Sequence, residues 1–274
     1  ELFNEIARCN NMQMARKILL NSLYGALGNQ YFRYFSIEFA EAITLTGQFV
    51  IRWIETNLND YFNKMLKTTK KDYIIAVDTD SNYVNLGPLV SMIMPDEKDI
   101  DKMVTVVDKI CSDKLEPYID SCFDDLAQHT NAYTNFMKMK RESIANKGIW
   151  TAKKRYILNV YDNEGIRYTE PKLKMMGIEA VKSSTPASCR VNIKKALKLI
   201  METDETTLQK FIQDFRVEFR SLPFEEVAFP RGCRGLSEYR SKENIYQKGT
   251  PIHVRGALLY NHLLNTHGLT KRYP

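Results

Sequence analysis

The stretch that decides the fold covers residues 73–86 and reads Tyr73-Ile74-Ile75-Ala76-Val77-Asp78-Thr79-Asp80-Ser81-Asn82-Tyr83-Val84-Asn85-Leu86. Apolar residues on each side of a polar centre predict two short strands joined by a turn, because Asp, Thr and Ser favour turns. Side chains alternate along a strand, so we expect Asp78 and Asp80 to point the same way. Two adjacent carboxylates repel, and a divalent ion such as Mg²⁺ removes that cost. An ordinary polar hairpin turn is the competing interpretation.

Two helices are predicted before this hairpin. Apolar residues recur at helical spacing over residues 6–27, and this first pattern ends at Gly25 and Gly28. A longer helix is expected from an N-cap at Ser36 to about Lys67. The first helix takes its apolar positions from Ile6, Met14, Ile18 and Leu19, and the second buries a stripe made of Phe39, Ala42, Ile43, Phe49, Val50, Trp53, Ile54, Leu58 and Tyr61.

The rest of the chain alternates between helical and strand-like patterns. A helix with an acidic outer face is predicted over residues 97–128, followed by strands over residues 135–144, 149–161 and 166–173, with a turn at residues 162–165. Thr185-Pro186 predicts a capped helix to about residue 201, and Thr203 or Asp204 caps another to about residue 220. Residues 222–250 look irregular, with room for small strands, and a last helix begins after Pro251. This order predicts an α+β fold with a helical C-terminal subdomain.

Composition narrows the class of protein. The chain has 274 residues, of which 44% are hydrophobic and 26% charged, as in globular proteins. No apolar run approaches the roughly 20 residues of a membrane span, and no signal peptide opens the sequence. Five cysteines without a C-x-x-C pair argue against a zinc site or a disulfide framework and favour a reducing, cytoplasmic location. The chain begins without Met and inside a helical pattern, so we expect it to be one part of a longer or split polypeptide.

The positive charge is concentrated in one segment. Residues 138–174 hold ten Lys and Arg against four Asp and Glu, a net of +6, whereas residues 96–125 hold four Lys against ten Asp and Glu, a net of −6. The whole chain carries +6. A basic segment of this kind is typical of a surface that follows phosphates.

The first predicted helix carries a candidate nucleotide site. Offsets of four and seven residues place Lys17, Asn21 and Tyr24 on one face. That face offers a cation for phosphate, an amide, and an aromatic ring for a base or sugar, while Gly25 leaves the backbone open to close approach. We expect the opposite side to supply core residues. An amphipathic helix with a solvated polar face is the alternative.

Within the basic segment, residues 153–156 read Lys153-Lys154-Arg155-Tyr156 on a predicted strand. Alternation would send Lys153 and Arg155 to one face, and Lys154 and Tyr156 to the other. Such a strand could hold phosphates on one side and reach a groove with the other. A sheet edge protected by charge is the alternative interpretation.

Taken in order, the three sets resemble the motifs of one family. Lys17-x-x-x-Asn21-Ser22-x-Tyr24-Gly25, Asp78-Thr79-Asp80-Ser81 and Lys153-Lys154-Arg155-Tyr156 are similar to the K-x3-N-S-x-Y-G, D-T-D-S and K-K-R-Y motifs of family B DNA polymerases, most of all the replicative enzymes of large tailed bacteriophages. Three ordered motifs are far more specific than one. The resemblance covers nearly the whole chain and continues through residues 170–174, 183–186 and 251–256.

The resemblance implies an architecture of three parts. Residues 1–29 would be a helix of the fingers, residues 30–177 an antiparallel palm sheet with packed helices, and residues 178–274 the start of a helical thumb. Lys17 would bind the incoming triphosphate with support from Asn21, and Tyr24 would lie under the nascent base pair. Asp80 and Asp78 would be the catalytic, metal-binding carboxylates. Lys153, Lys154, Arg155 and Tyr156 would hold the primer–template duplex, and Glu142 and Asp162 match further acidic positions of the group.

The implied reaction is template-directed addition of dNTPs to a primer 3′ end with two Mg²⁺ ions. The implied partners are primer–template DNA, a dNTP, the upstream polymerase and exonuclease portion that contains a further metal-binding aspartate, and a sliding clamp bound through a segment not present in this chain. No membrane is implied, and the location would be the cytoplasm of the host cell. Two alternatives stay open: a duplex-binding module without catalysis, and a template-independent nucleotidyl transferase.

Overall fold

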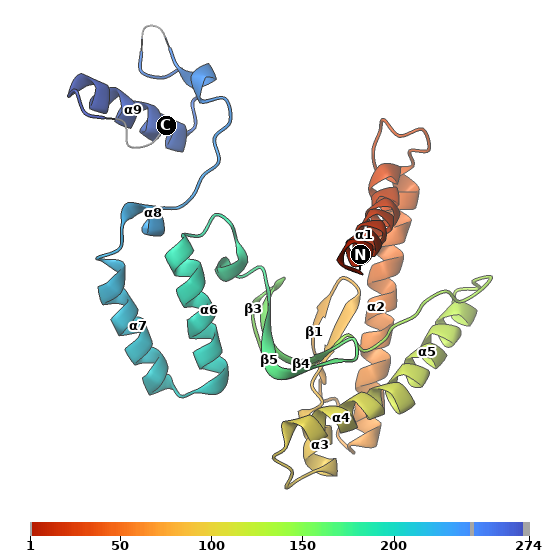
Figure 1. The fold of residues 1–274 in the computed structure, drawn as a ribbon. Helices are drawn as coiled ribbons and strands as arrows, with labels where there is room; N and C mark the ends of the chain where they lie inside the picture. The colour runs from red at the N-terminus through yellow and green to blue at the C-terminus, as the bar shows by residue number, and fades with distance from the viewer. Residues whose placement is uncertain (1, 242–243, 271–274) are drawn as a thin grey trace. The chain divides into compact units, whose positions relative to one another are not determined.

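The computed structural model describes residues 2–241 and 244–270 and confirms the α+β class (Figure 1). The chain divides into two compact units, one made of Glu1–Gly148 and Leu158–Lys172, the other of Ile149–Ile157 and Leu173–Pro274. The strands form a two-stranded sheet of β1 and β2 and a three-stranded sheet in the order β3-β4-β5. No helix in the described part of the chain is both long and apolar enough to cross a membrane.

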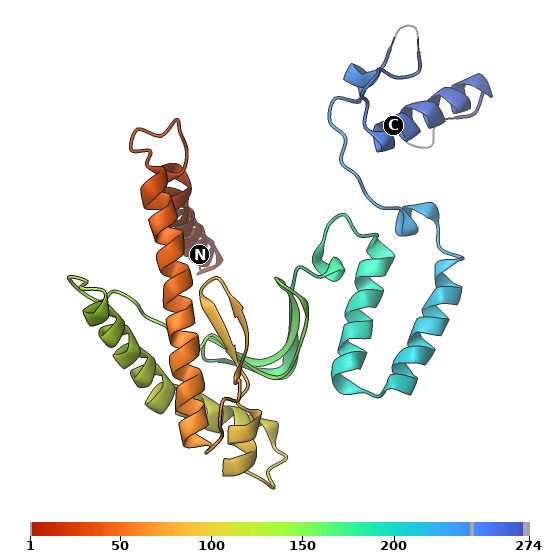
Figure 2. The ribbon, with the colours of Figure 1, turned by 180° about the vertical axis from the view of Figure 1, so that it is seen from behind.

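Helix α1 (Leu2–Leu27) is present as predicted, but its apolar side chains are not in the core. No residue of α1 is buried, and the expected core residues are exposed, Ile18 by 58% and Leu19 by 73%. Helix α1 lies beside the first part of α2 (Ile37–Met65), as Figures 1 and 2 show. The periodicity therefore predicts the helix correctly and its burial wrongly, because the pattern does not say which surface covers it.

Helix α2 is capped by Ser36, whose side-chain oxygen accepts a hydrogen bond from the Phe39 N–H at 3.2 Å, as predicted. Its buried residues are Ala40, Ile51, Ile54, Leu58 and Phe62. The predicted stripe is confirmed at Ile54 and Leu58, and Val50, Trp53 and Tyr61 pack against the core. It is wrong at Phe39, Ala42, Ile43 and Phe49, which are exposed, because this first part of α2 lies outside the core cluster.

The core of the first unit forms where the second part of α2 meets β1 and three shorter helices. These are α3 (Gly87–Ile93), which the sequence does not predict, α4 (Ile100–Ile110) and α5 (Glu116–His129). The single helix predicted for residues 97–128 is interrupted between α4 and α5 by a π-helical turn, Cys111–Leu115. Trp53 Nε1 donates to the Cys122 carbonyl at 3.0 Å, and Tyr118 Oη donates to the Asn57 carbonyl at 3.2 Å, so α5 is fixed on α2.

The three-stranded sheet contains β3 (Ser143–Ala152), β4 (Arg155–Asn163) and β5 (Ile166–Met176). Two-residue turns join these strands, which is the connection of antiparallel neighbours. The strand predicted over residues 135–144 is largely absent, since only its last two residues belong to β3. The strand predicted over residues 149–161 is broken at Lys153 and Lys154, which form the turn between β3 and β4.

The second unit is helical beyond the sheet. It contains α6 (Ala187–Glu202), α7 (Glu205–Phe219), the short α8 (Phe224–Val227) and α9 (Ile252–Thr266). Asp204 caps α7 by accepting from the Thr207 N–H at 2.8 Å, as one of the two predicted caps. At α6 the predicted cap is wrong by one residue, because Pro186 occupies the N-cap position. Between residues 222 and 250 the described residues form only α8 and the 3-10 turn Leu236–Tyr239, without a strand.

Candidate active site

The predicted hairpin is present and ends in a two-residue turn. Strands β1 (Ile74–Asp78) and β2 (Ser81–Val84) are antiparallel, and Asp78 lies opposite Ser81. Only Thr79 and Asp80 remain for the turn, in which the Asp80 N–H donates to the Asp78 carbonyl at 2.7 Å. Thr79 has a φ of +54°, which a β-branched residue rarely adopts. A non-glycine residue in this left-handed region stores strain of about 1–3 kcal/mol, a feature that clusters at functional sites.

Side chains of α2 fix the strand that leads to this turn. Asn59 Oδ1 accepts from the backbone N–H groups of Tyr73 at 2.7 Å and Ile74 at 3.2 Å. Asn63 Nδ2 donates to the Lys71 carbonyl at 2.7 Å. Tyr73 is almost fully buried, with 1% of its surface exposed. The first residues of β1 are therefore held on α2, while Asp80 is exposed at the turn.

Asp78 and Asp80 are not paired by the strand alternation that the sequence pattern predicts. Alternation along a strand does not apply to Asp80, because it lies in the turn and not in a strand. Asp78 ends β1, and Asp80 follows two positions later within the turn. Thr79 Oγ1 donates to Asp78 Oδ1 at 3.2 Å. Carboxylate oxygens are the donors that Mg²⁺ prefers, so this pair fits the ion in kind. Within the described residues no group of three or more His, Cys, Asp or Glu side chains is arranged to hold a metal.

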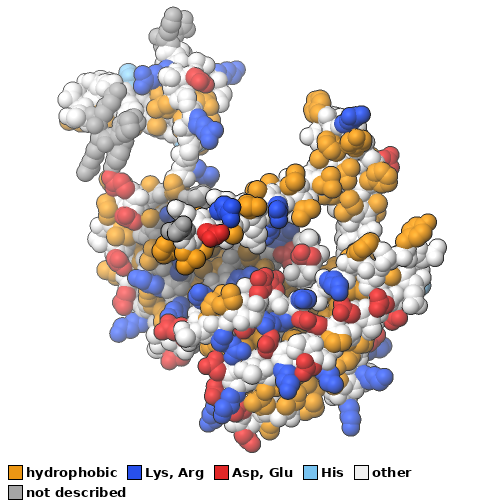
Figure 3. All heavy atoms as spheres, turned by 45° about the vertical axis from the view of Figure 1, so that its right-hand side comes forward, with side chains coloured by type: hydrophobic (Ala, Val, Ile, Leu, Met, Phe, Trp, Pro, Cys, Tyr) orange, Lys and Arg blue, Asp and Glu red, His pale blue; other side chains and the backbone are white. Residues whose placement is uncertain are grey.

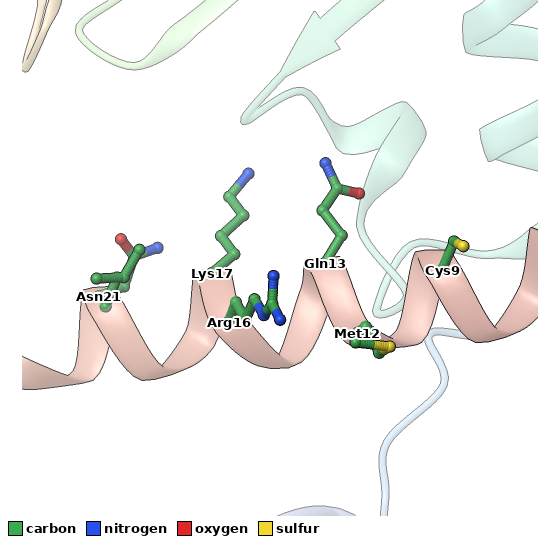
Figure 4. Close-up of a pocket in the computed structure, with 7 residues that line it drawn as sticks. Cys9, Met12, Gln13, Arg16, Lys17 and Asn21 are labelled. Carbon is green, nitrogen blue, oxygen red and sulfur yellow. The ribbon is translucent and has the colours of Figure 1, made fainter.

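Two of the candidate nucleotide residues, Lys17 and Asn21, share one face of α1, as the sequence predicts. Figure 4 shows Gln13, Lys17 and Asn21 projecting from the same side of the helix. They border a shallow surface pocket lined by Cys9, Met12, Gln13, Arg16, Lys17, Leu20 and Asn21. Arg16 adds a second cation, which the sequence interpretation does not include. Two cations and two amides around one pocket suit an anionic ligand.

Tyr24 and Gly25 occupy the last turns of the same helix. Tyr24 is 46% exposed. A side chain added at Gly25 would meet no other atom within 4 Å, so the backbone there is open. Both observations agree with a surface that can receive a flat ring.

The basic motif of residues 153–156 adopts a different geometry from the predicted continuous strand. Lys153 and Lys154 are exposed in the turn, and Lys154 has a φ of +60°. Arg155 and Tyr156 begin β4, and Tyr156 is buried and stacks on Trp150 with ring centroids 6.2 Å apart. The predicted alternation of faces is therefore wrong. The motif presents two lysines at a tip, and an arginine and a tyrosine behind them.

A buried ion network was not apparent from the sequence. Asp162, on β4, accepts from Arg141 Nη1, from Arg167 Nε at 3.4 Å and from the Gly165 N–H at 3.0 Å. Arg141 also pairs with Asp108 on α4. Burial opposes ionisation of Asp162, but these hydrogen bonds outweigh it and lower the pKa of its carboxyl. Asp162 therefore holds the sheet on α4, and partners this far apart in the chain leave no signal in local sequence patterns.

Comparison with known proteins agrees with the three motifs. A model of DNA polymerase family B matches residues 3–244, a range that includes all three. The chain belongs to DNA polymerase family B. The DNA-directed DNA polymerase of Enterobacteria phage T4 is 37% identical over 269 residues, which are 95% of this chain and 30% of that protein. The DNA-directed DNA polymerase of Escherichia phage RB69 is 38% identical over 258 residues, which are 91% of this chain and 28% of that protein.

Membership of family B confirms the resemblance drawn from the sequence. The chain spans about 30% of the length of the first of these relatives. The roles of individual residues stay predictions at this point. The same is true of the division into fingers, palm and thumb.

Proposed function

We propose that the chain is the part of a phage-type family B DNA polymerase that adds dNTPs to a primer 3′ end under the direction of a template. The observation that carries this proposal is the strained turn that presents Asp78 and Asp80 at the end of a strand held on α2. A strained turn on a fixed strand is a suitable way to hold two repelling carboxylates ready for a cation. The family membership of the chain supports the same reaction class.

Asp78 and Asp80 would hold the divalent metal, for which we propose two Mg²⁺ ions. When bound, such ions supply the positive charge that activates the primer hydroxyl and stabilises the leaving pyrophosphate. The described residues offer these two carboxylates but no third acidic ligand next to them. We therefore propose that the upstream portion of the polymerase contributes the remaining aspartate.

The other candidate residues would bind and orient the reactants. Lys17 would contact the triphosphate of the dNTP, supported by Asn21, and Tyr24 would pack under the nascent base pair. The lysines at the turn of residues 153–154 would contact the phosphates of the primer–template duplex. Phosphoryl transfer depends mainly on positioning and charge neutralisation, so these residues would act by holding groups in place.

Residues 1–29 would belong to the fingers, residues 30–177 to the palm and residues 178–274 to the thumb. The partners would be primer–template DNA, a dNTP and the upstream polymerase and exonuclease portion. A sliding clamp would bind a segment outside this chain, and the enzyme would act in the cytoplasm of the host cell.

One observation favours a second function for the chain on its own. It spans about 30% of the relative from phage T4, and its acidic site holds two carboxylates. Taken alone, the chain would bind duplex DNA without adding nucleotides. The active enzyme would need the upstream portion.

Primer extension tests these proposals. The purified chain is mixed with labelled primer–template, dNTPs and Mg²⁺, with and without the upstream polymerase portion. We expect templated extension only when both are present, and none after chelation of the metal. Asp80→Ala should lower the extension rate by about 10³-fold or more, because the site loses a metal ligand, with duplex affinity changed less than about twofold.

Asp125→Ala, which removes an exposed carboxylate on α5, is the matched control and should extend at the wild-type rate. Undiminished extension by Asp80→Ala would refute the metal assignment. Extension that ignores the template sequence would favour the template-independent transferase.

A further inference from the structure

The turn at Lys153 and Lys154 is supported from behind by the segment that follows β5. Gly177 has a φ of +63°, and a Cβ at this position would lie 2.3 Å from the Lys154 carbonyl oxygen and 3.1 Å from Arg155 Cγ. The nearer neighbour is backbone, which cannot move aside without moving the turn. Only glycine therefore permits this approach, for reasons of both space and conformation.

Arg155 is held by the same segment. Its Nη2 donates to both carboxylate oxygens of Glu179, and Lys182 Nζ lies 3.3 Å from Glu179 Oε1. Glu179 begins the 3-10 turn Glu179–Val181. A backbone hydrogen bond, together with the two cations, lowers the pKa of Glu179, so the carboxylate is ionised at neutral pH.

The element that presents Glu179 is anchored in a core. Its neighbours Ile178 and Ala180 are 6% and 1% exposed and pack with Ile157 and Met201. Ile157 lies on β4, two residues beyond Arg155. The carboxylate is thus fixed by buried residues on both sides, and its arginine partner is fixed by the strand.

From this arrangement we propose that Gly177 and Glu179 are positioning residues for the DNA-binding turn. Arg155 then supports the turn through its ion pair with Glu179 and does not contact phosphate. The inference rests on the proposed function, in which Lys153 and Lys154 contact the duplex. The lysines at the tip carry the charge that DNA meets. The guanidinium behind them is paired with the carboxylate of Glu179, which offsets its positive charge.

The two possible roles of Arg155 predict effects of opposite sign. If Arg155 bound phosphate, Glu179→Gln would release it, add one positive charge near the DNA and strengthen binding. If Arg155 instead supports the turn, the same substitution breaks the ion pair that holds the turn in place. Binding then weakens, although the net charge becomes more positive. A purely electrostatic effect therefore cannot imitate the expected result.

The experiment measures duplex binding by fluorescence anisotropy over a range of salt concentrations, with the full chain and a labelled primer–template. We expect Glu179→Gln and Gly177→Ala each to weaken binding about five- to tenfold, as for the loss of one charge-assisted contact. Exchanging the charges, with Arg155→Glu and Glu179→Arg together, should restore affinity to within about threefold. Lys154→Ala should weaken binding and reduce the salt slope by about one unit.

Matched controls come from the same unit. Glu202→Gln removes the carboxylate of an exposed ion pair with Lys198, and Gly256→Ala adds a methyl group that meets no atom within 4 Å. Both should bind as the wild type does. Thermal unfolding of every variant identifies any that has not folded, and Glu179→Gln alone then decides the question, because it is isosteric.

Stronger binding by Glu179→Gln would overturn the positioning role. So would unchanged binding by both Glu179→Gln and Gly177→Ala, if Lys154→Ala still weakens binding. Either outcome would leave the proposed DNA surface intact. Unchanged binding by Lys154→Ala instead overturns the DNA surface itself. The two failures are therefore distinguishable.

Discussion

Asp162 carries a buried negative charge that the fold satisfies completely with its own residues. Only 2% of its surface is exposed, and it accepts hydrogen bonds from Arg141, Arg167 and the Gly165 N–H. Arg141 extends the network to Asp108 on α4. Removing one partner of a buried ion pair leaves an uncompensated charge, which costs more than the pair contributes when intact.

Substituting Asp162 should therefore destabilise the first unit. We expect Asp162→Asn to lower the free energy of unfolding by about 2–4 kcal/mol, because two arginines lose their common carboxylate. Urea denaturation followed by the fluorescence of Trp53, in a Trp150→Phe background, would measure the change. Asp125→Asn is the exposed control and should lie within about 0.5 kcal/mol of the wild type. A loss no larger than that of the control would contradict the structural role.

The pH dependence follows from the sign of the pKa shift. The carboxyl of Asp162 has a lower pKa in the folded chain than in the unfolded chain. Its stabilising contribution is present above the unfolded pKa of about 3.9 and is lost as pH falls through the folded value. The difference in unfolding free energy between wild type and Asp162→Asn should be constant above about pH 5 and shrink below about pH 4. A difference that grows on acidification would reverse the assigned direction.

Among the elements, the π-helical turn Cys111–Leu115 sets the direction of α5. A π-turn is wide enough to take up one extra residue within an α-helix, so the residues that follow keep the face they would have without it. Beyond it, α5 buries Ile119, Cys122, Phe123 and Leu126 against the core of the first unit. The wide turn therefore lets these side chains meet α2 although the chain carries one residue more than a regular helix would.

Deleting Asp113 should convert the turn to regular α-helix and leave the buried face of α5 in place, because the extra residue that the wide turn takes up is then gone. We therefore expect cooperative unfolding to be kept, with a midpoint close to that of the wild type, seen by circular dichroism and calorimetry. Asp113→Ala keeps the chain length and should unfold with a midpoint close to that of the wild type, because Asp113 is exposed. A deletion variant that loses cooperative unfolding while Asp113→Ala keeps it would contradict this role of the π-turn.

These elements show what local sequence patterns can predict. The hairpin, α1, α2, α7 and α9 were predictable, because periodicity, caps and turn residues act within a few positions. The π-turn was not, because one added residue leaves the apolar pattern nearly unchanged. The turn at Lys153 and Lys154 was not either, since it contains no Gly, Pro, Asn or Asp and relies on Gly177 for support.

In the candidate site, too, some features follow from local sequence and others depend on the folded chain. The sequence predicts that Lys17 and Asn21 share a face and that Asp78 and Asp80 are close neighbours, because both follow from spacing. It does not predict that Arg155 pairs with Glu179, a partner in a later element. Ion pairs between distant segments are set by tertiary packing, so they become visible only in the folded chain.

At the scale of the whole molecule, the hydrophobic surface of the α1–α2 arm needs an explanation. Apolar side chains gather over this arm in Figure 3. Those of α1 that are exposed include Leu2, Phe3, Ile6, Met12, Met14, Ile18, Leu19, Leu20, Leu23 and Tyr24. They surround the helix, a pattern typical of a buried helix and not of a solvated one. Within the proposed function, the upstream polymerase portion is the partner that covers them.

A charge placed on this surface should block assembly without harming the chain itself. We expect Leu19→Glu to unfold at the wild-type midpoint, because Leu19 is 73% exposed and Glu is a good helix former. Its affinity for the upstream portion should fall by about tenfold or more, since a carboxylate would be desolvated in an apolar interface. Binding is measured directly by calorimetry, and primer extension should fall in parallel.

Val217→Glu provides the control, because Val217 on α7 has the same exposure of 73% and lies in the second unit. It should associate and extend as the wild type does. If Leu19→Glu binds the upstream portion with undiminished affinity, the apolar arm is not the surface that joins the two parts. Loss of association by both variants would point instead to a general effect of added negative charge on a chain that must also meet DNA.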